Sequence, residues 1–255
     1  MKIIISPAKK MKCHPDDLAP KTTPVFLEET KRLLNWLKGL SYDEAKALWA
    51  CSDKIAEENY QRIRTMDLAA GLTPAILSYE GIQYQYMAPA VFEEEAMRYI
   101  QDHLRILSGF YGVLKPFDGV TPYRLEMQAK GGADGCRTLY EFWGDKIFRE
   151  VRDEDRTILN LASKEYSKCI EAFLDPEDHF ITCVFGQLID GEVKQKGTLA
   201  KMARGEMVRF MAERQIEDIK EIRGFDRLGY RFDASRSTEE CYVFLKEDEQ
   251  YDKKK

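Results

Sequence analysis

The sequence predicts an α/β fold (α+β mixed): a single compact domain in which helices surround one mixed β-sheet. Short apolar runs rich in β-branched residues alternate with amphipathic helical segments along the chain. The run 157–161 is apolar almost throughout, which is typical of a central strand covered on both faces. With 255 residues, 44% of them hydrophobic, the chain is long and apolar enough for one substantial core. We therefore expect residues 1–255 to form one domain.

The predicted strands follow the apolar runs. Residues 2–6 form a β-branched run that ends at Pro7, so a loop carrying Lys9 and Lys10 should follow the carboxyl end of this strand. Further extended segments are expected at 104–107, 157–161, 179–185, 192–197, 229–233 and 241–246.

The predicted helices follow the 3.6-residue period. Over 24–40, leucine and phenylalanine residues recur on one face of a helix. Residues 42–66 indicate two helices joined by a tight connection, and Ser52 is a candidate N-cap of the second helix, with Lys54 close to its positive end. Helices are also expected at 90–103, 139–154, 164–173 and 198–214.

Composition limits the classes of function. The net charge is −5, opposite in sign to a dedicated nucleic-acid binder, so any recognition of phosphate must be local. The first residues offer only three consecutive strongly apolar side chains, too few for a signal peptide or a membrane span. We expect a cytoplasmic protein with no membrane partner, free and buried thiols for its six scattered cysteines, and a polar tail at about 248–255.

Several catalytic and cofactor sites are not indicated. The three histidines, His14, His103 and His179, lie far apart and form no HxH or HExxH pattern, so a zinc site or a Ser-His triad has no support. The chain has neither a GxGxxG nor a GxxxxGK[ST] motif. We expect neither a metal ion nor a cofactor.

The segment 103–127 is the most unusual, because glycines, prolines and aromatics surround several charged side chains. Arg124 and Glu126, two positions apart on an extended chain, point to the same side and could bind a ligand together or simply pair with each other. Asn160 and Ser163 follow as a strand-to-loop transition, although Ser163 could also be an ordinary N-cap. Spacing alone leaves these alternatives open.

The helix expected at 198–214 places Lys201 and Arg204 on the face opposite its apolar stripe. Such charged residues are usually only solvated. Gly205, however, lowers helix stability by about 1 kcal/mol relative to alanine, which indicates that something approaches the helix closely there.

Eight stretches, taken in order, resemble the YaaA family: Ile5–Lys9; Ser52–Lys54 with Asn59 and Arg62; Leu104–Pro116; Pro122–Met127; Tyr140–Gly144; Asn160–Ser163; Ala203–Gly205; and Gly229–Tyr230. The resemblance implies a single-domain fold with a helix-hairpin-helix element, here at about 42–66, beside a positively charged cleft. It also implies a role in limiting oxidative DNA damage during peroxide stress. The turn of this hairpin reads Ala50-Cys51-Ser52, where a typical one carries glycines.

The leading hypothesis is a noncatalytic protein of the peroxide response that binds duplex or branched DNA through its phosphates. Its candidate anion-binding residues are Lys9, Ser52, Lys54, Arg62, Arg105, Arg124, Lys201 and Arg204. The alternative is an enzyme acting on a small anionic or nucleobase-like ligand, with Glu126 as a candidate general base beside Arg124 and Asn160. A closed pocket holding Glu126 and two arginines would favour the enzyme. A third alternative is that these polar residues only rigidify the core.

Overall fold

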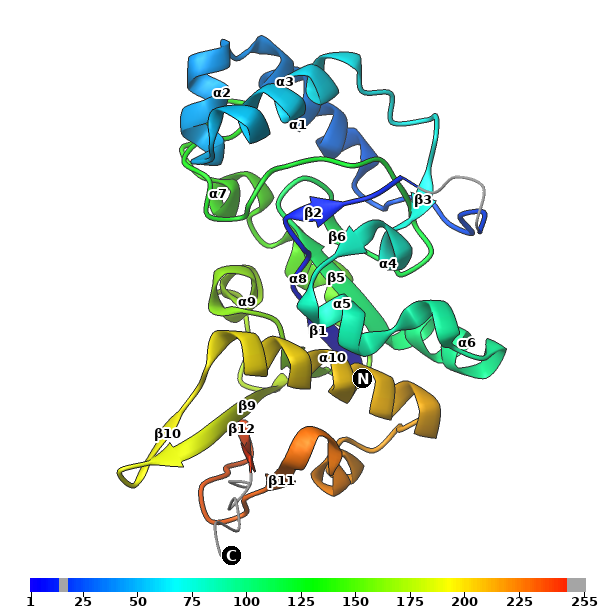
Figure 1. Ribbon diagram of the computed structural model, residues 1–255, viewed down its shortest axis with the longest axis vertical. Coiled ribbons are helices and arrows are strands. Elements are labelled where there is room, and N and C mark those ends of the chain that lie inside the picture. The colour runs from blue at the N-terminus through cyan, green and yellow to red at the C-terminus, as the bar shows by residue number, and fades with distance from the viewer. Residues whose placement is uncertain (14–17, 247–255) are drawn as a thin grey trace, which may run out of the picture.

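An eight-stranded mixed sheet forms the centre of the computed structural model, which describes residues 1–13 and 18–246 (Figure 1). The strand order is β11-β12-β9-β8-β1-β5-β6, and β10 pairs with β9. The strands are β1 (Lys2–Ile5), β5 (Leu104–Ser108), β6 (Gly112–Leu114), β8 (Thr157–Leu161), β9 (His179–Ile189), β10 (Glu192–Lys194), β11 (Tyr230–Phe232) and β12 (Cys241–Lys246). The predicted fold class is confirmed.

The strand β1 lies in the middle of this sheet. It pairs in parallel with β5 on one side, Ile3 opposite Leu104, and with β8 on the other, Ile5 opposite Leu161. Its three isoleucines are fully buried, because helices cover both faces of the parallel strands. The strand β8 lies between β1 and β9, so the prediction that 157–161 is a central strand is confirmed.

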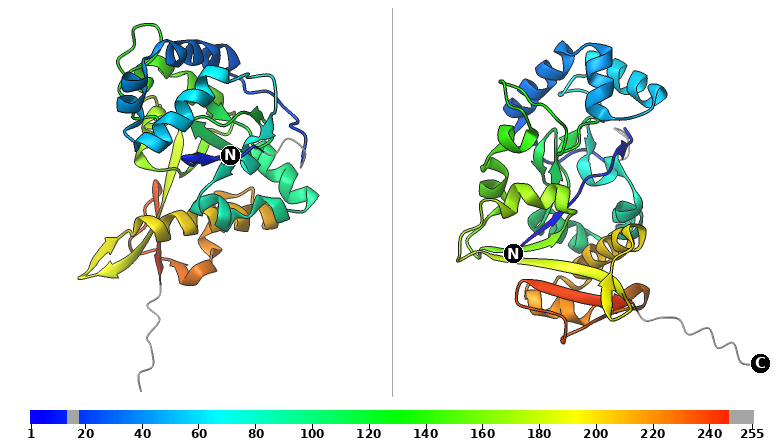
Figure 2. Two further views of the ribbon diagram at one scale, coloured as in Figure 1. Left: turned by 45° about the horizontal axis from the view of Figure 1, so that its top comes forward. Right: turned by 90° about the vertical axis from the view of Figure 1, so that its left-hand side faces the viewer.

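Helices flank the sheet on both sides. In Figure 2 (right), the helices of residues 146–171 lie on one side of β1, and the helices of residues 82–103 and 197–214 lie on the other. Their bounds are α5 (Ile82–Met87), α6 (Glu94–His103), α8 (Lys146–Val151), α9 (Lys164–Glu171) and α10 (Gly197–Arg214). The remaining helices are α1 (Leu27–Gly39), α2 (Tyr42–Trp49), α3 (Asp53–Thr65), α4 (Ala75–Ser78) and α7 (Leu139–Trp143), with 3-10 helices at Pro89–Val91, Ile219–Gly224 and Arg227–Gly229.

Two of the predicted helices require correction. The helix expected at 139–154 is broken into α7 and α8, because Gly144 adopts a positive φ of 51° that ends α7. The helix expected at 90–103 begins only at Glu94, after a 3-10 turn. The short helix α5 and the strand β6 were not predicted, and α5 is important for the site described below.

The helices α2 and α3 form the predicted pair and contact each other. Ser41 begins α2 with a capping box, in which its side chain accepts from the Glu44 amide and the Glu44 carboxylate accepts from the Ser41 amide. Ser52 occupies the N-cap position of α3 as predicted, but its side chain makes no capping hydrogen bond, so that part of the prediction is wrong.

The helix α10 packs closely on α5 through Gly205. A Cβ atom at this position would lie 2.1 Å from the carbonyl oxygen of Gln83 and 3.0 Å from the amide nitrogen of Met87. Only glycine allows this approach. The prediction that something lies close to Gly205 is therefore confirmed, and the neighbour is the backbone of α5.

Two small sheets lie beside the main one: β2 (Lys10–Met11) with β4 (Tyr79–Glu80), and β3 (Thr73–Pro74) with β7 (Gly119–Val120). Lys10 therefore lies in a strand, so the prediction from the sequence that it lies in a loop is wrong. All six cysteines are free, but only Cys169 and Cys183 are buried, so the expectation of buried thiols was too broad. The polar tail expected at about 248–255, like His14, lies outside the described residues. Within the described part, none of the helices is long and apolar enough to cross a membrane.

Candidate functional site

A cleft of about 400 Å³ opens at the carboxyl ends of β1 and β8, beside the loop 121–127 that packs on the carboxyl end of β5. In the sheet, β5 lies on one side of β1 and β8 lies on the other side, so the order in which the chain adds strands reverses at β1. Ligands of open α/β sheets bind at such a reversal of strand order, because the connections on its two sides diverge and leave a crevice. The cleft therefore occupies the position in this fold that best suits a small-molecule site.

Hydrogen bonds between neighbouring strand ends form one wall of the cleft. Ser6 follows β1 and Ser163 follows β8, and the Ser163 amide donates to Ser6 Oγ at 2.8 Å. The hydroxyl of Tyr84, in α5, donates to the Ser6 carbonyl oxygen at 3.0 Å. The starts of α5 and α9 are thereby held beside the end of β1.

The loop 121–127 forms the opposite wall, and buried contacts hold it. A Cβ atom at Gly109 would lie 2.5 Å from the Leu125 carbonyl oxygen, so the turn after β5 approaches the loop closely. The Tyr123 hydroxyl lies 2.6 Å from Ser108 Oγ and 2.8 Å from the Tyr79 hydroxyl. These contacts fix the backbone from which Arg124 and Glu126 extend.

Glu126 is neutralised by two cations. Its carboxylate pairs with Arg124 at 3.1 Å and with Lys9 at 2.8 Å, and the Arg124 and Glu126 side chains are 13% and 18% exposed. The pairing left open by the sequence is therefore present, and both residues also line the cleft. Glu80 likewise pairs with Lys10 and Lys12, which lower the pKa of its carboxyl.

Lys201 and Arg204 also line the cleft, three residues apart on α10. Within residues 1–13 and 18–246, neither forms an ion pair. Arg204 Nε is inaccessible to solvent and has no hydrogen-bond partner there. Burial lowers the pKa of the Arg204 guanidinium, which nevertheless stays charged near neutral pH. Two cations of the cleft are therefore uncompensated.

Glu165 is a third carboxylate of the cleft, beside Glu80 and Glu126, and the sequence did not indicate it as a site residue. Burial, and to a smaller extent the charge of Glu126, raise the pKa of its carboxyl, while a hydrogen bond from the Gln128 amide at 3.3 Å opposes the rise. Two carboxylates in different surroundings are a common arrangement for proton transfer. The only signal in the sequence was its place two residues after Ser163.

Gln83 is another residue of the cleft that sequence reasoning missed. It lines the cleft and is buried, and its side-chain Nε2 has no hydrogen-bond partner among the described residues. A buried donor without a partner is costly, unless a ligand or water accepts from it. No sequence signal marks it, because α5 itself was not predicted.

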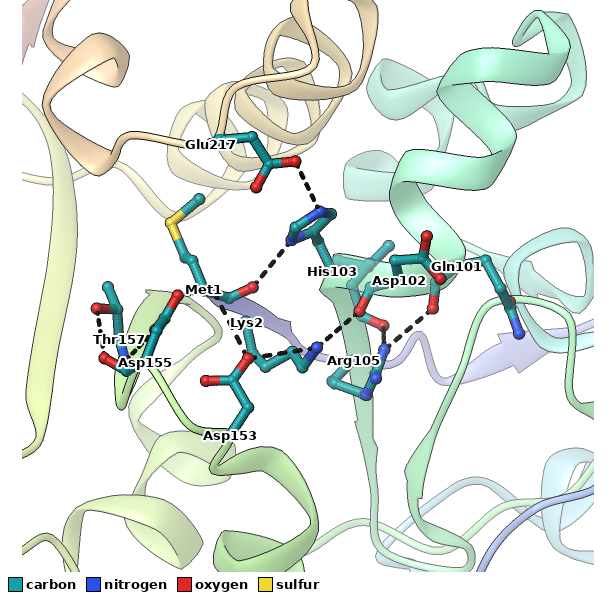
Figure 3. A network of polar contacts seen from close by, with 11 residues as sticks. Met1, Lys2, Gln101, Asp102, His103, Arg105, Asp153, Asp155, Thr157 and Glu217 are labelled. Atoms are coloured by element: carbon teal, nitrogen blue, oxygen red, sulfur yellow. Dashed lines mark hydrogen bonds and ion pairs between the residues drawn. The ribbon is translucent and has the colours of Figure 1, made fainter.

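Arg105 does not reach this cleft, contrary to its grouping with the other basic residues. It lies at the amino end of β5, where its guanidinium donates to the carbonyl oxygens of Gln101 and Leu104 (Figure 3). It lines a separate cavity of about 300 Å³ with Asp118 and Glu150. The cleft lies at the carboxyl ends of the strands, whereas Arg105 lies near the amino end of β5.

Asn160 also lies outside the cleft, so its predicted role beside Glu126 is corrected. It lines a neighbouring cavity of about 580 Å³ that has Arg204 in common with the cleft. Its side chain is engaged, since Nδ2 donates to Thr182 Oγ1 at 3.2 Å and Oδ1 accepts from the Ala162 amide at 2.9 Å. These bonds tie the end of β8 to β9.

The hairpin residues form a separate group on α3. Arg62 is held within its own helix by Glu58 and Asn59. Lys54 is exposed and forms no ion pair among the described residues. The turn residue Ala50 lines a cavity of about 740 Å³ that has Glu126 in common with the cleft, so the hairpin borders the site without entering it.

The structure thus brings together Lys9, Arg124, Glu126, Lys201 and Arg204, and leaves Ser52, Lys54, Arg62, Arg105 and Asn160 elsewhere. In the described ranges, His, Cys, Asp and Glu side chains form no group of three or more that could hold a metal ion.

Comparison with known proteins assigns the family. The model of a family described as "Peroxide stress protein YaaA" matches residues 1–236. The chain belongs to the YaaA family. Among its relatives are UPF0246 proteins of Agathobacter rectalis, 58% identical over 96% of this chain and 98% of the relative, and of Desulfitobacterium hafniense, 57% identical with the same coverage. A UPF0246 protein of Pediococcus pentosaceus is 53% identical, again over 96% and 98%.

The YaaA family match includes every residue that lines the cleft, from Ser6 to Arg204. The resemblance inferred from eight separate stretches of sequence is therefore confirmed. Four of those stretches contribute residues to the cleft although they are far apart in the sequence: Ile5–Lys9, Pro122–Met127, Asn160–Ser163 and Ala203–Gly205.

Proposed function

We propose that this chain serves the peroxide-stress response in the cytoplasm by binding, and acting on, a small anionic or nucleobase-like ligand in the cleft. The family supplies the stress role. The observation that supports a small ligand is the cleft, which lies at the reversal of strand order and is lined by Arg124, Glu126 and Arg204. Its volume of about 400 Å³ suits a small molecule, since ligand pockets span roughly 300–1,000 Å³.

The test is a binding screen on the full chain. Small carboxylates, phosphates, nucleobases and nucleotides are added singly, and the thermal midpoint and the hydrogen exchange of α5 and the loop 121–127 are measured. At least one class should raise the midpoint and protect both segments. Arg124→Gln should abolish the gain, whereas Lys220→Ala, at an exposed lysine distant in sequence, should not. If no compound protects these segments, the proposal is wrong.

Anion binding should depend on pH through Glu165. Burial raises the pKa of this carboxyl above its ordinary value of 4.5. Below the raised pKa Glu165 is neutral, and as pH rises through it a negative charge returns to the cleft. The affinity for sulfate, which keeps its charge over this range, should therefore fall with rising pH, by roughly tenfold.

Isothermal titration from pH 4.5 upward measures this dependence. The charged and titratable groups around Glu165 are Lys9, Glu126, Tyr140 and Tyr166. Glu165→Gln should flatten the profile and raise the affinity at neutral pH. A profile that keeps its slope in this variant would assign the dependence to another group.

DNA is a second candidate ligand. DNA binding is the leading hypothesis from the sequence. The observation that favours it is the position of the hairpin: its turn borders a cavity that adjoins the cleft at Glu126, and Lys54 is exposed and free of ion pairs among the described residues. Free amides at the start of α3 could hydrogen-bond a phosphate without reading any base. The cation pairs of Glu80 and Glu126 weaken the positive field of the cleft.

A salt titration decides this candidate. If DNA binds, the logarithm of its affinity should fall steeply and linearly with the logarithm of salt concentration, as counterions are released. Lys54→Ala and Arg204→Ala should weaken binding to duplex and branched DNA of every sequence, and Lys220→Ala should not. Fluorescence anisotropy measures both. An affinity that does not change with salt excludes DNA.

A further inference from the structure

We infer that the part of the cleft formed by Gln83, Ser163, Lys201 and Arg204 is a subsite for the phosphate group of a phosphate monoester whose remainder carries no further negative charge. The inference rests on the proposed function and specifies the chemical class of its ligand. Three observations in the same cavity support it: Lys201 and Arg204 have no acidic partner among the described residues, the buried donor of Gln83 has no hydrogen-bond partner there, and α9 begins at Ser163.

The charge of the subsite matches a dianion. Lys201 and Arg204 lie one helical turn apart on α10, so both face the same region. Among the described residues neither has an acidic partner, whereas Lys9, Lys10 and Arg124 all have one. Two positive charges left without a carboxylate fit a phosphate monoester, which carries nearly two negative charges at neutral pH.

The hydrogen-bond donors of the subsite point to the same group. Gln83 Nε2 and Arg204 Nε are both buried without a partner in the described structure. Because Gly205 has no Cβ atom, α10 packs directly against the backbone of α5. The two donors therefore lie on helices that have little freedom to separate. A group with several acceptor oxygens would satisfy both donors at once, and a phosphate has three terminal oxygens.

The start of α9 adds backbone donors. Ser163 is the N-cap of this eight-residue helix, and its side chain makes no capping bond to α9. The Ser163 amide donates to Ser6 Oγ and the Tyr166 amide donates to the Ser163 carbonyl oxygen, so the amides of Lys164 and Glu165 are the ones at this helix start that favour an anion. This helix start is relevant because it lines the same cavity as the two unsatisfied side-chain donors.

The carboxylates of the cleft determine what the rest of the ligand can be. Glu126 and Glu165 line the same cleft as the subsite, together with Tyr123 and Tyr166. Because Glu126 is paired with Lys9 and Arg124, the charge of Glu165 is the one that would repel a second anionic group, and both carboxylates accept hydrogen bonds from N–H and O–H donors. The body of the ligand is therefore neutral or cationic, bears hydrogen-bond donors and offers an apolar surface to the tyrosines.

Calorimetry with simple probes tests the subsite. Phenyl phosphate and inorganic phosphate should bind, and benzoate, which has the same ring with a planar monoanion, should bind at least tenfold more weakly than phenyl phosphate. Arg204→Gln should lower the affinity for phenyl phosphate by at least tenfold. Arg209→Gln, on the same helix but paired with Glu213, should leave it unchanged.

Gln83→Leu separates ligand binding from a structural role. Removing an unsatisfied buried donor should keep or raise the thermal midpoint of the free protein, while the affinity for phenyl phosphate falls several-fold. Equal binding of benzoate and phenyl phosphate, both sensitive to Arg204→Gln, would overturn the phosphate subsite and leave the proposed function intact. If phosphate binds equally well to the wild type, Arg204→Gln and Gln83→Leu, the anion binds elsewhere and the proposed phosphate subsite is also wrong.

Discussion

Replacing Gly205 with alanine is expected to destabilise the protein by about 3 kcal/mol, a typical upper value for forced overpacking of a core. The new Cβ would lie 2.1 Å from the Gln83 carbonyl oxygen and 3.0 Å from the Met87 amide nitrogen, both in the backbone of α5. Because backbone atoms cannot rotate away as a side chain can, α5 must separate from α10. The gain of about 1 kcal/mol in helix propensity does not offset this strain.

The consequence extends to the site, since α5 carries Gln83 and α10 carries Arg204. Denaturant unfolding should show the loss of stability, and the folded variant should bind cleft ligands more weakly. Gly197→Ala is the matched control, because Gly197 begins the same helix and has nothing within 4 Å of its Cβ position. If both variants unfold at the same denaturant concentration, the close approach of the two helices has no energetic importance.

The Gly109→Ala variant should lose the opposite wall of the cleft. Its Cβ would lie 2.5 Å from the Leu125 carbonyl oxygen and 3.1 Å from the Met127 amide nitrogen. The turn cannot retreat, because Trp143, which is fully buried, donates from Nε1 to the Gly109 carbonyl oxygen at 3.0 Å. The loop 121–127 must move instead, and it displaces Glu126 from Lys9. We again expect a loss of about 3 kcal/mol.

Two measurements check this prediction. Hydrogen exchange should increase in the loop 121–127, and ligands of the cleft should no longer protect it. Gly39→Ala serves as the control, since the position at the end of α1 has open space around it. Protection of the loop that is the same in wild type and Gly109→Ala would mean that the loop is held by other contacts.

Strands of the sheet were largely predictable because burial on both faces leaves an uninterrupted apolar run, as in β1 and β8. The helix α5 could not be predicted from the sequence, because the segment Ile82–Met87 has six residues and no side-chain cap. Isolated helices of this length are not stable. It is formed by packing against α10, and no local pattern records such a contact.

The site was predictable in part for a similar reason. Arg105 and Arg124 belong to one unusual segment, yet the first lies at the beginning of β5 and the second in a loop beyond its end. The cleft lies at the carboxyl ends of β1 and β8, and the carboxyl end of β5 supports the loop that carries Arg124, so the position along β5 decided which arginine belongs to the cleft. Glu165 and Gln83 carry ordinary side chains, and only the fold places them in the cavity.

The central position of β1 also has a consequence for how the chain folds during synthesis. Residues 2–5 leave the ribosome early, but their partners, residues 104–106 and 158–161, are made much later. Until then three consecutive isoleucines have no neighbouring strand, and unpaired apolar strands are prone to associate with other chains. β1 gains its second neighbour only after β8 has been made, so the growing chain should depend on chaperones until that point.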